Sequence, residues 1–285
     1  MNSHPISLEQ LLSNPDLPSI PEALLKLNDL IKHARPIAEI TEVIERDPGL
    51  AARSLELANS AWYKRSRTIA SVKDAITTIG LDALHQLVFA TSVIRTFQGI
   101  DKNVADMRSF WNQSLLLACN AKCIKETVGD NNPVHIFTSG MVTYIGKLII
   151  YMSVAEQANN ILRDSRQHPE LQHQAEQLAL GFNHADVSAG LLKKWEIPES
   201  IYLPIQYYTT PLSAPKDHRV DASALFVAHQ LVYQKADVLN TNETDQLQPA
   251  LTTLDLSQDQ LVAIQQQANA DLSQAATIVG INSSV

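Results

Sequence analysis

The sequence predicts an all-α protein, and three observations support this fold class. Apolar residues recur at helical spacing, as Leu24, Leu27 and Leu30 do on one face of a predicted helix. Helix-capping residues stand directly before many of these apolar segments. Strand signals are nearly absent, because no hairpin dipeptide separates two alternating apolar runs. We therefore expect helices joined by short turns throughout the 285 residues.

In the N-terminal part, residues that cap or open helices mark where each predicted helix begins. These residues are Ser7 with Gln10, Pro21, Pro36, Asp47 with Pro48, and Ser71 with Asp74. Gly80 is expected to end the helix that Ser71 opens, because glycine is the usual residue after a helix C-terminus. The next predicted helix covers 81–97 and carries Leu84, Leu87 and Val88.

The rest of the chain has the same pattern. It predicts helices over 105–128, 133–152, 156–166, 170–180, 185–195, 199–208 and 219–235, and a last helix that Ser257 and Gln260 cap. Loops are expected at 209–217, which is rich in proline, and at 240–249. The polar break at 98–103 is the expected domain boundary. We predict an N-terminal helical subdomain over 1–98, a second helical subdomain over 99–240, and a C-terminal helical extension over 241–285.

Composition limits the classes of partner. The formal net charge of −8 argues against nucleic-acid binding, because neutralising phosphates requires a basic surface. The same charge disfavours an anionic membrane surface. Cys119 and Cys123 are expected to be buried thiols, which suits a reducing compartment. With neither a signal peptide nor a membrane span predicted, we expect a cytoplasmic protein.

A metal-site signature with exchanged ligands stands in the middle of the chain. The segment 135–150 resembles the helix of the HD superfamily of metal-dependent phosphohydrolases, which has the pattern F-x-x-G-L-L-H-D-I-G-K-L. Residues 145–148 match this pattern, but Thr143 and Tyr144 stand where it carries His and Asp. A hydroxyl and a phenol are poor ligands for divalent cations, which imidazole and carboxylate groups hold. The segment therefore predicts a hydrolase scaffold without its metal ligands.

The N-terminal part carries a second resemblance, over three motifs. They are Leu17-Pro-Ser-Ile-Pro21, then Asp47-Pro48-Gly-Leu50 with Leu55-Glu-Leu57-Ala58-Asn59-Ser60-Ala61, and finally Ala75-Ile76-Thr-Thr-Ile-Gly80. This pattern is very similar to the HDOD family, the HD-related output domain of bacterial signalling proteins, over about 17–235. The resemblance implies an N-terminal helical bundle packed on a degenerate HD-like helical bundle. It also implies a regulatory role.

The resemblance assigns the metal-ligand positions of the hydrolases to residues of this sequence. The core positions hold Gln113, Thr143, Tyr144 and His229, and the accessory positions hold His184, Tyr207 and Tyr208. None of the four core positions keeps its ligand type, so we expect no bound metal and no cofactor. Ser188 stands where family members usually carry glycine, and we expect only slightly looser packing there.

Two alternatives remain for these side chains. His184 and His229 form a two-histidine metal site, or one is a histidine that caps or hydrogen-bonds within the core and the other is partly exposed on its helix. Tyr144, Tyr207 and Tyr208 fill the vacated cavity with their rings, or they line a pocket rebuilt for a small ligand such as a nucleotide.

A basic stretch without intervening acids is the candidate face for an acidic partner or a phosphate-bearing ligand. It consists of Lys64, Arg65, Arg67 and Lys73. The alternative interpretation is a solvated loop.

The sequence thus predicts a non-catalytic bacterial regulatory module that binds a signalling protein. Two other functions remain open: a metal-dependent phosphohydrolase with an atypical site, and a sensor of a small ligand such as a nucleotide.

Overall fold

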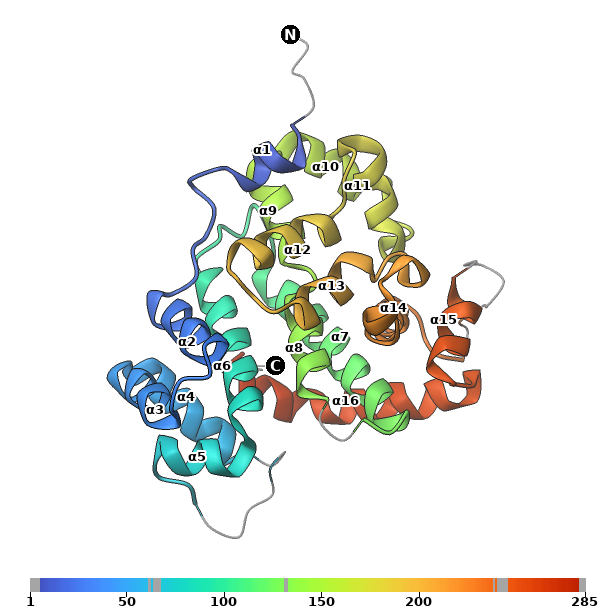
Figure 1. Cartoon of the computed structure of the whole chain (residues 1–285). Coiled ribbons are helices and arrows are strands. Elements are labelled where there is room, and N and C mark those ends of the chain that lie inside the picture. Colours follow the sequence, from blue (N-terminus) through green and yellow to red (C-terminus); the bar gives the residue numbers. More distant parts are fainter. Residues whose placement is uncertain are drawn as a thin grey trace. The chain divides into compact units, whose positions relative to one another are not determined.

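The computed structural model describes residues 6–60, 63, 68–130, 133–237, 239 and 246–281. These residues form helices and no strand, which confirms the all-α prediction (Figure 1). The chain divides into two compact units. The large unit contains Met1–Leu17 and Gly99–Asp271, and the small unit contains Pro18–Gln98 and Leu272–Val285.

The small unit is built from five consecutive helices and the end of the last one. The five are α2 (Glu22–Lys32), α3 (Ile37–Arg46), α4 (Pro48–Ala58), α5 (Val72–Ile79) and α6 (Leu81–Thr96). The predicted caps are present: the Asp47 carboxylate accepts from two N–H groups of α4, and the Ser71 hydroxyl accepts from Asp74 N. Asn59 fixes the connection between α4 and α5, because its side chain bonds both the N–H and the carbonyl of Ile69 at 2.8 Å.

The large unit contains the remaining helices. They are α1 (Leu8–Leu12), α7 (Met107–Thr127), α8 (Val134–Val142), α9 (Ile145–Ser153), α10 (Ala155–Asp164), α11 (Gln172–Leu180), α12 (His184–Lys194), α13 (Glu199–Tyr207), α14 (Arg219–Tyr233) and α15 (Leu247–Leu254), with short 3₁₀ turns η2 (Pro169–Leu171), η3 (Pro211–Ser213) and η4 (Lys216–His218). The last helix, α16 (Gln258–Val279), contributes residues to both units.

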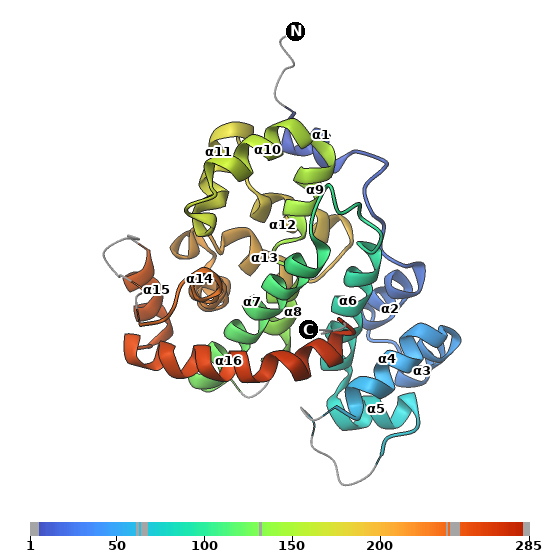
Figure 2. The ribbon, with the colours of Figure 1, turned by 180° about the vertical axis from the view of Figure 1, so that it is seen from behind.

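Helices α7, α8 and α14 pack together in the middle of the large unit (Figure 2). Gly140 allows α8 to approach α7 closely, since a Cβ at this position would lie 2.6 Å from the Cα of Ala118. Cys119 and Cys123 are buried on α7, as predicted. These close contacts form a rigid frame for the side chains that face the middle of the unit.

The predicted helix over 133–152 is interrupted. Helix α8 ends at Val142 and α9 begins at Ile145, so Thr143 and Tyr144 form a break between them. Among the described residues, the stretch Val134–Ser153 is one helical segment long and apolar enough to cross a membrane, but 83% of its most apolar window is buried inside the protein. Burial of this kind is typical of a core helix.

The two units change at Gln98 and Gly99, where the sequence analysis placed a boundary, but the terminal segments are assigned differently. Residues 1–17 belong to the large unit, because α1 packs on α12, and the extension over 241–285 is shared between the units. The predicted loop at 240–249 is wrong at its end, since α15 begins at Leu247. Pro249 suggested a loop, but it lies in the first turn of α15. Proline is tolerated there because the N–H that it lacks would have no intrahelical partner.

Candidate functional site

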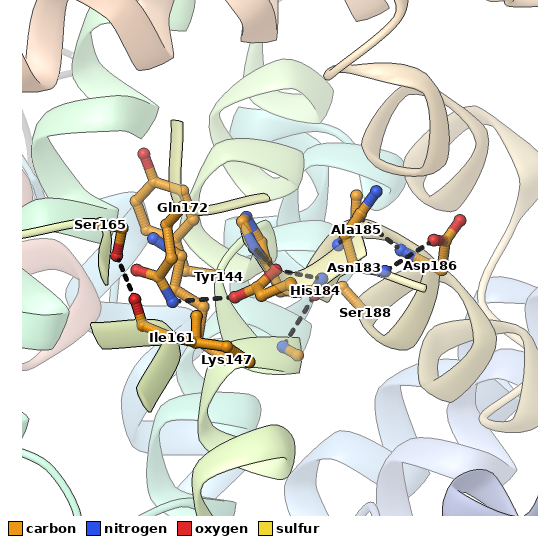
Figure 3. Close-up of polar contacts among 12 residues, drawn as sticks. Tyr144, Lys147, Ile161, Ser165, Gln172, Asn183, His184, Ala185, Asp186 and Ser188 are labelled. Carbon is orange, nitrogen blue, oxygen red and sulfur yellow. Dashed lines mark hydrogen bonds and ion pairs between the residues drawn. The ribbon is translucent and has the colours of Figure 1, made fainter. Parts of the chain in front are cut away.

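The site lies inside the large unit, where the break before α9 and five helices bring polar side chains together. The break between α8 and α9 supplies Tyr144, and α9 supplies Lys147. Helices α11 and α12 supply Glu176 and His184, and Figure 3 shows Tyr144, Lys147 and His184 among the polar contacts of this region. The end of α13 and helix α14 supply the remaining rings. Within the described residues, this set forms a buried polar network inside an apolar core.

The first chain of hydrogen bonds joins Tyr144 to His229 on α14. The Tyr144 hydroxyl lies 2.6 Å from His229 Nδ1, and His229 Nε2 lies 2.8 Å from the carbonyl oxygen of Glu170. A carbonyl can only accept, so the proton of His229 is on Nε2 and the Tyr144 hydroxyl donates to Nδ1. Burial, with the positive charge of Lys147, holds the pKa of His229 well below its usual value, and the ring is neutral.

The second chain joins Tyr208, His184 and Glu176. The Tyr208 hydroxyl lies 2.5 Å from His184 Nε2, and His184 Nδ1 lies 2.5 Å from Glu176 Oε2. The backbone N–H of His184 donates to the same carboxylate oxygen at 2.7 Å. Glu176 Oε1 accepts from Gln172 Nε2 at 2.8 Å, and Gln172 Nε2 also donates to the Tyr151 hydroxyl at 2.9 Å. His184 and Gln172 therefore bond one buried carboxylate directly, and Tyr208 and Tyr151 are joined to it through them.

The charges in this second chain are fixed by its surroundings. Burial alone would raise the pKa of Glu176, but the groups of His184 and the charge of Lys147 lower it, so the carboxylate is ionised. Burial also lowers the pKa of His184, and the neutral ring donates Nδ1–H to Glu176 and accepts from Tyr208. Burial raises the pKa of Tyr208 well above its usual value, which keeps the phenol protonated as a donor.

Lys147 is the buried cation of the network. Its side chain is 4% exposed, and Nζ lies 4.3 Å from the centre of the Tyr144 ring and 3.4 Å from the Tyr233 hydroxyl. Burial alone would lower the pKa of Lys147, but Tyr233, Tyr151 and Glu176 raise it, so the ammonium stays charged. The Tyr233 hydroxyl donates in turn to Gln113 Oε1 at 3.2 Å, which links α7 to the network.

Ser188 corrects a sequence prediction, because it does not loosen the packing. Its side chain is fully buried; Oγ accepts from Gly146 N at 2.8 Å and donates to the carbonyl of Thr143 at 2.7 Å. Thr143 lies in the break between α8 and α9, and Gly146 lies in the first turn of α9, where backbone N–H groups lack helical partners. Serine therefore joins α12 to the break, which glycine could not do.

Changing Ser188 to glycine is expected to lower the free energy of unfolding by about 2–4 kcal/mol. The variant leaves two buried backbone groups without partners, each costing about 1–3 kcal/mol, and it adds the backbone entropy of glycine. Urea unfolding of both proteins measures the difference. Ser188→Ala is the matched variant, since it loses the same hydrogen bonds without the glycine effect. A stability equal to that of the native chain in both variants would contradict this role.

The structure brings together some of the predicted site residues and separates others. Tyr144, His184, Tyr208 and His229 meet in one network, and Gln113 reaches it through Tyr233. Two predicted residues lie apart: the buried Thr143 hydroxyl donates to Ser139 O at 2.7 Å, and Tyr207 is half-exposed. Of the predicted basic face, Lys73 is exposed on α5, whereas Lys64, Arg65 and Arg67 lie outside the described residues.

Sequence reasoning missed the carboxylate of the network. Glu176 is fully buried, and it is the acid on α11, a helix whose other residues carry no formal charge at neutral pH. A lone acid in an uncharged helix is the signal that could have identified it, because buried charges are rare unless they are paired. Tyr151, Gln172 and Tyr233 gave no such signal, since their contacts come from helices far apart in the sequence.

The residues present do not fit the divalent cation of the HD hydrolases. Within the described part of the chain, no group of three or more His, Cys, Asp or Glu side chains could hold a metal ion. Both ring nitrogens of His184 and both of His229 already have hydrogen-bond partners within the protein. Gln113, Thr143 and Tyr144 offer an amide, a hydroxyl and a phenol, and such groups bind divalent cations weakly.

The buried histidines predict that acid destabilises the protein. Burial lowers the pKa values of His184 and His229, and it lowers the pKa of His173 on α11 to about 4. As the pH falls through about 6.5, the unfolded chain takes up protons that the folded chain does not, so each such histidine costs up to about 1.4 kcal/mol per pH unit. Urea unfolding should give a constant stability above about pH 7.5 and a steady loss towards pH 5. His173→Gln should reduce the slope, and a stability independent of pH would contradict the assignment.

The comparisons with known proteins agree with the fold. The family model of the HDOD domain matches residues 17–211. A protein of Treponema pallidum (strain Nichols), described as uncharacterized, is 20% identical over 219 residues, which is 76% of this chain and 42% of that protein. The chain therefore spans less than half the length of this relative.

Three crystal structures show the same fold. A protein provisionally named a phosphohydrolase, from Shewanella amazonensis SB2B, is 24% identical with a TM-score of 0.72, covering 98% of each chain. An HDOD domain protein with unknown function, from Geobacter sulfurreducens, is 22% identical with a TM-score of 0.72, covering 94% of this chain and 95% of that one. A protein provisionally named for signal transduction, from Marinobacter aquaeolei VT8, is 20% identical with a TM-score of 0.68, covering 97% of this chain and 61% of that one. Together with the family model, which covers most of the chain, they lead to one conclusion: this protein belongs to the HDOD domain family.

Proposed function

We propose that this chain is a non-catalytic regulatory module, which acts in the bacterial cytoplasm by binding a signalling protein. One observation carries the proposal: the Tyr144 hydroxyl, at a position where HD hydrolases carry a metal ligand, is bonded to His229 Nδ1 inside a closed core. Tyr144 and His229 are each 1% exposed, and His184 and Tyr208 are fully buried. A phosphoester would have no access to these groups.

The chemistry of hydrolysis supports the same proposal. A bound cation must lower the pKa of water towards 7 before the water attacks a phosphoester at neutral pH. Glu176 and Lys147, the two ionised side chains of the network, are buried and interact with neighbouring side chains rather than with solvent. The network therefore stabilises the fold, and we infer that it serves as a scaffold for a protein-binding surface.

The context of the family and the charge of the chain favour a protein partner. One protein of this fold, from Marinobacter aquaeolei VT8, is provisionally named for signal transduction. The net charge of −8 disfavours nucleic acid as the partner. The partner and the pathway are proposals, as the chain spans only 42% of its Treponema relative.

A hydrolysis assay tests the non-catalytic role. The purified chain is incubated with a generic phosphoester and with a cyclic dinucleotide, in the presence of manganese, iron, magnesium or zinc. We expect the same background rate as for His184→Ala. Turnover that the native chain shows and His184→Ala lacks would contradict the proposal. A protein captured from native extract supports the regulatory role only if it binds the chain again in purified form.

A further inference from the structure

Helix α16 belongs to both units and is continuous between them. Its residues up to Asp271 belong to the large unit, and those from Leu272 belong to the small unit. The 22 residues of Gln258–Val279 include neither glycine nor proline, so the helix has no residue that would favour a break at the junction. Helices form and fray cooperatively, and the order of one half therefore affects the order of the other.

One face of α16 is buried along the whole helix. In the large unit this face carries Leu261, Ile264 and Ala268, and in the small unit it carries Ala275 and Val279, all of them buried. Their spacing is that of a single apolar stripe on a helix. Helix α16 therefore has an apolar anchor in each unit.

In the large unit, the side chain of Gln265 holds the C-terminal end of α14. Its Nε2 donates to the carbonyl of Leu231 at 2.8 Å and to that of Gln234 at 2.9 Å, and its Oε1 accepts from the N–H of Ala236 at 3.0 Å. The last carbonyls of a helix have no partner within the helix. Gln265 thus supplies, from α16, hydrogen bonds that α14 cannot make by itself.

The end of α14 that Gln265 holds also carries a side chain of the buried network. Tyr233 is the last residue of α14, and its hydroxyl donates to Gln113 Oε1 at 3.2 Å and accepts from Lys147 Nζ at 3.4 Å. The ring of His229, one turn earlier, lies 5.2 Å from the ring of Tyr233. The hydrogen bonds of Gln265 therefore fix the turn from which Tyr233 reaches the network.

In the small unit, the other end of α16 packs against α4. Ile278 and Val279 are each 2% exposed. Gly280 follows the helix with a φ of +71°, and a Cβ at this position would lie 2.7 Å from Nη2 of Arg53 on α4. This end of α16 is therefore part of the packed interior of the small unit.

We propose that α16 couples the two units, because Gln265 holds the C-terminal turn of α14 in place only while the other half of α16 is packed in the small unit. When that half is released, the helix frays from its C-terminal end towards Gln265, which lies about two turns before Leu272. The Ala236 N–H then loses its acceptor, and Tyr233 loses its fixed position. A change in the packing of Ile278 in the small unit is thereby transmitted to the buried network of the large unit.

Hydrogen exchange at the Ala236 amide tests the coupling, because this amide reports whether the side chain of Gln265 is in place. NMR measures its exchange rate in the native full chain and in Ile278→Ala, which removes buried contacts of α16 in the small unit. We expect exchange at Ala236 to become at least about 5-fold faster, the factor that corresponds to the net contribution of one hydrogen bond. Gln265→Ala should accelerate it at least as much. Gln267→Ala is the matched control, since Gln267 is exposed and bonds Asp271 on the same helix, and the same acceleration there overturns the proposal.

A break in α16 distinguishes coupling from a general loss of stability. Glycines inserted between Asp271 and Leu272 interrupt the helix, so that its two halves no longer order each other. In this background we expect Ile278→Ala to leave the exchange rate of the Ala236 amide unchanged. Equal acceleration with and without the insertion overturns the proposal, and so does an unchanged rate when the helix is continuous. If Ile278→Ala does not fold, Ile278→Val replaces it, with an expected acceleration of at least about 2-fold.

The outcome is independent of the test of the proposed function. An Ala236 amide that does not respond to Ile278→Ala rejects the coupling and leaves the non-catalytic role as it stands. Phosphoester turnover would reject the non-catalytic role even if α16 couples the two units.

Discussion

Replacing Glu176 with alanine is expected to lower the free energy of unfolding by about 3 kcal/mol or more, because it leaves three buried donors without their acceptor, and each unsatisfied buried group costs about 1–3 kcal/mol. Glu176 is fully buried and accepts hydrogen bonds from the ring and backbone of His184 and from Gln172. Its negative charge also helps to keep the buried Lys147 ionised. Alanine removes the acceptor of these three donors. It also leaves the buried Lys147 ammonium without the negative charge that helps to keep it ionised.

Chemical unfolding of the native chain and of Glu176→Ala measures this loss. Glu42→Ala is the matched control, since Glu42 pairs with Arg46 on the same helix but its side chain is 59% exposed. Exposed pairs contribute about 0–1 kcal/mol, so the control should unfold almost as the native chain does. Equal stability of the two variants would show that Glu176 is not the centre of the network.

Adding one methyl group at Gly146 should destabilise the protein by about 3 kcal/mol or more, since overpacking a close-packed core costs about 1–3 kcal/mol and the approach here is unusually short. A Cβ at this position would lie 2.1 Å from the carbonyl oxygen of His184 and 2.8 Å from the N and the Oγ of Ser188. These are mostly backbone atoms of α12, which cannot move alone. Helices α9 and α12 must separate, and the bonds of Ser188 to the break are lost with them.

The melting temperature and urea midpoint of Gly146→Ala measure the effect. Gly181→Ala is the comparison, because Gly181 has a φ of +83° and open space where a Cβ would stand. Gly181→Ala should lose only about 1–2 kcal/mol of unfolding free energy, which is the cost of a left-handed backbone conformation for a residue other than glycine. A loss at Gly146 no greater than at Gly181 would mean that α9 and α12 are not packed as described.

Local signals explain why most of the helices could be predicted. Asp47 with Pro48 and Ser71 with Asp74 act within one turn of chain, and the structure shows both caps in place. The break at Thr143 and Tyr144 could not be predicted, because apolar residues continue through it and Ser188, more than forty positions away, satisfies its backbone. Helix α15 was missed for the opposite reason, since a local signal, Pro249, suggested a loop.

Several residues of the candidate site could be predicted from the sequence, but their hydrogen-bond partners and protonation could not. Alignment with the hydrolase pattern pointed to Tyr144, His184 and His229, which do meet. The partners that determine their protonation, Glu176 and Lys147, come from α11 and α9, and their proximity follows from the packing of those helices. The position of α1 on α12 could not be predicted either, because nothing in the sequence near Leu12 indicates that it packs on Gly190.

The metal content of the purified chain shows whether the network of Tyr144, His184 and His229 binds a metal ion, and we propose that it binds none. The full chain is produced in medium containing iron, manganese and zinc, purified without chelator, and analysed by inductively coupled plasma mass spectrometry. We expect far less than one ion of any of these metals per chain. A stoichiometric amount of iron, manganese or zinc would contradict it.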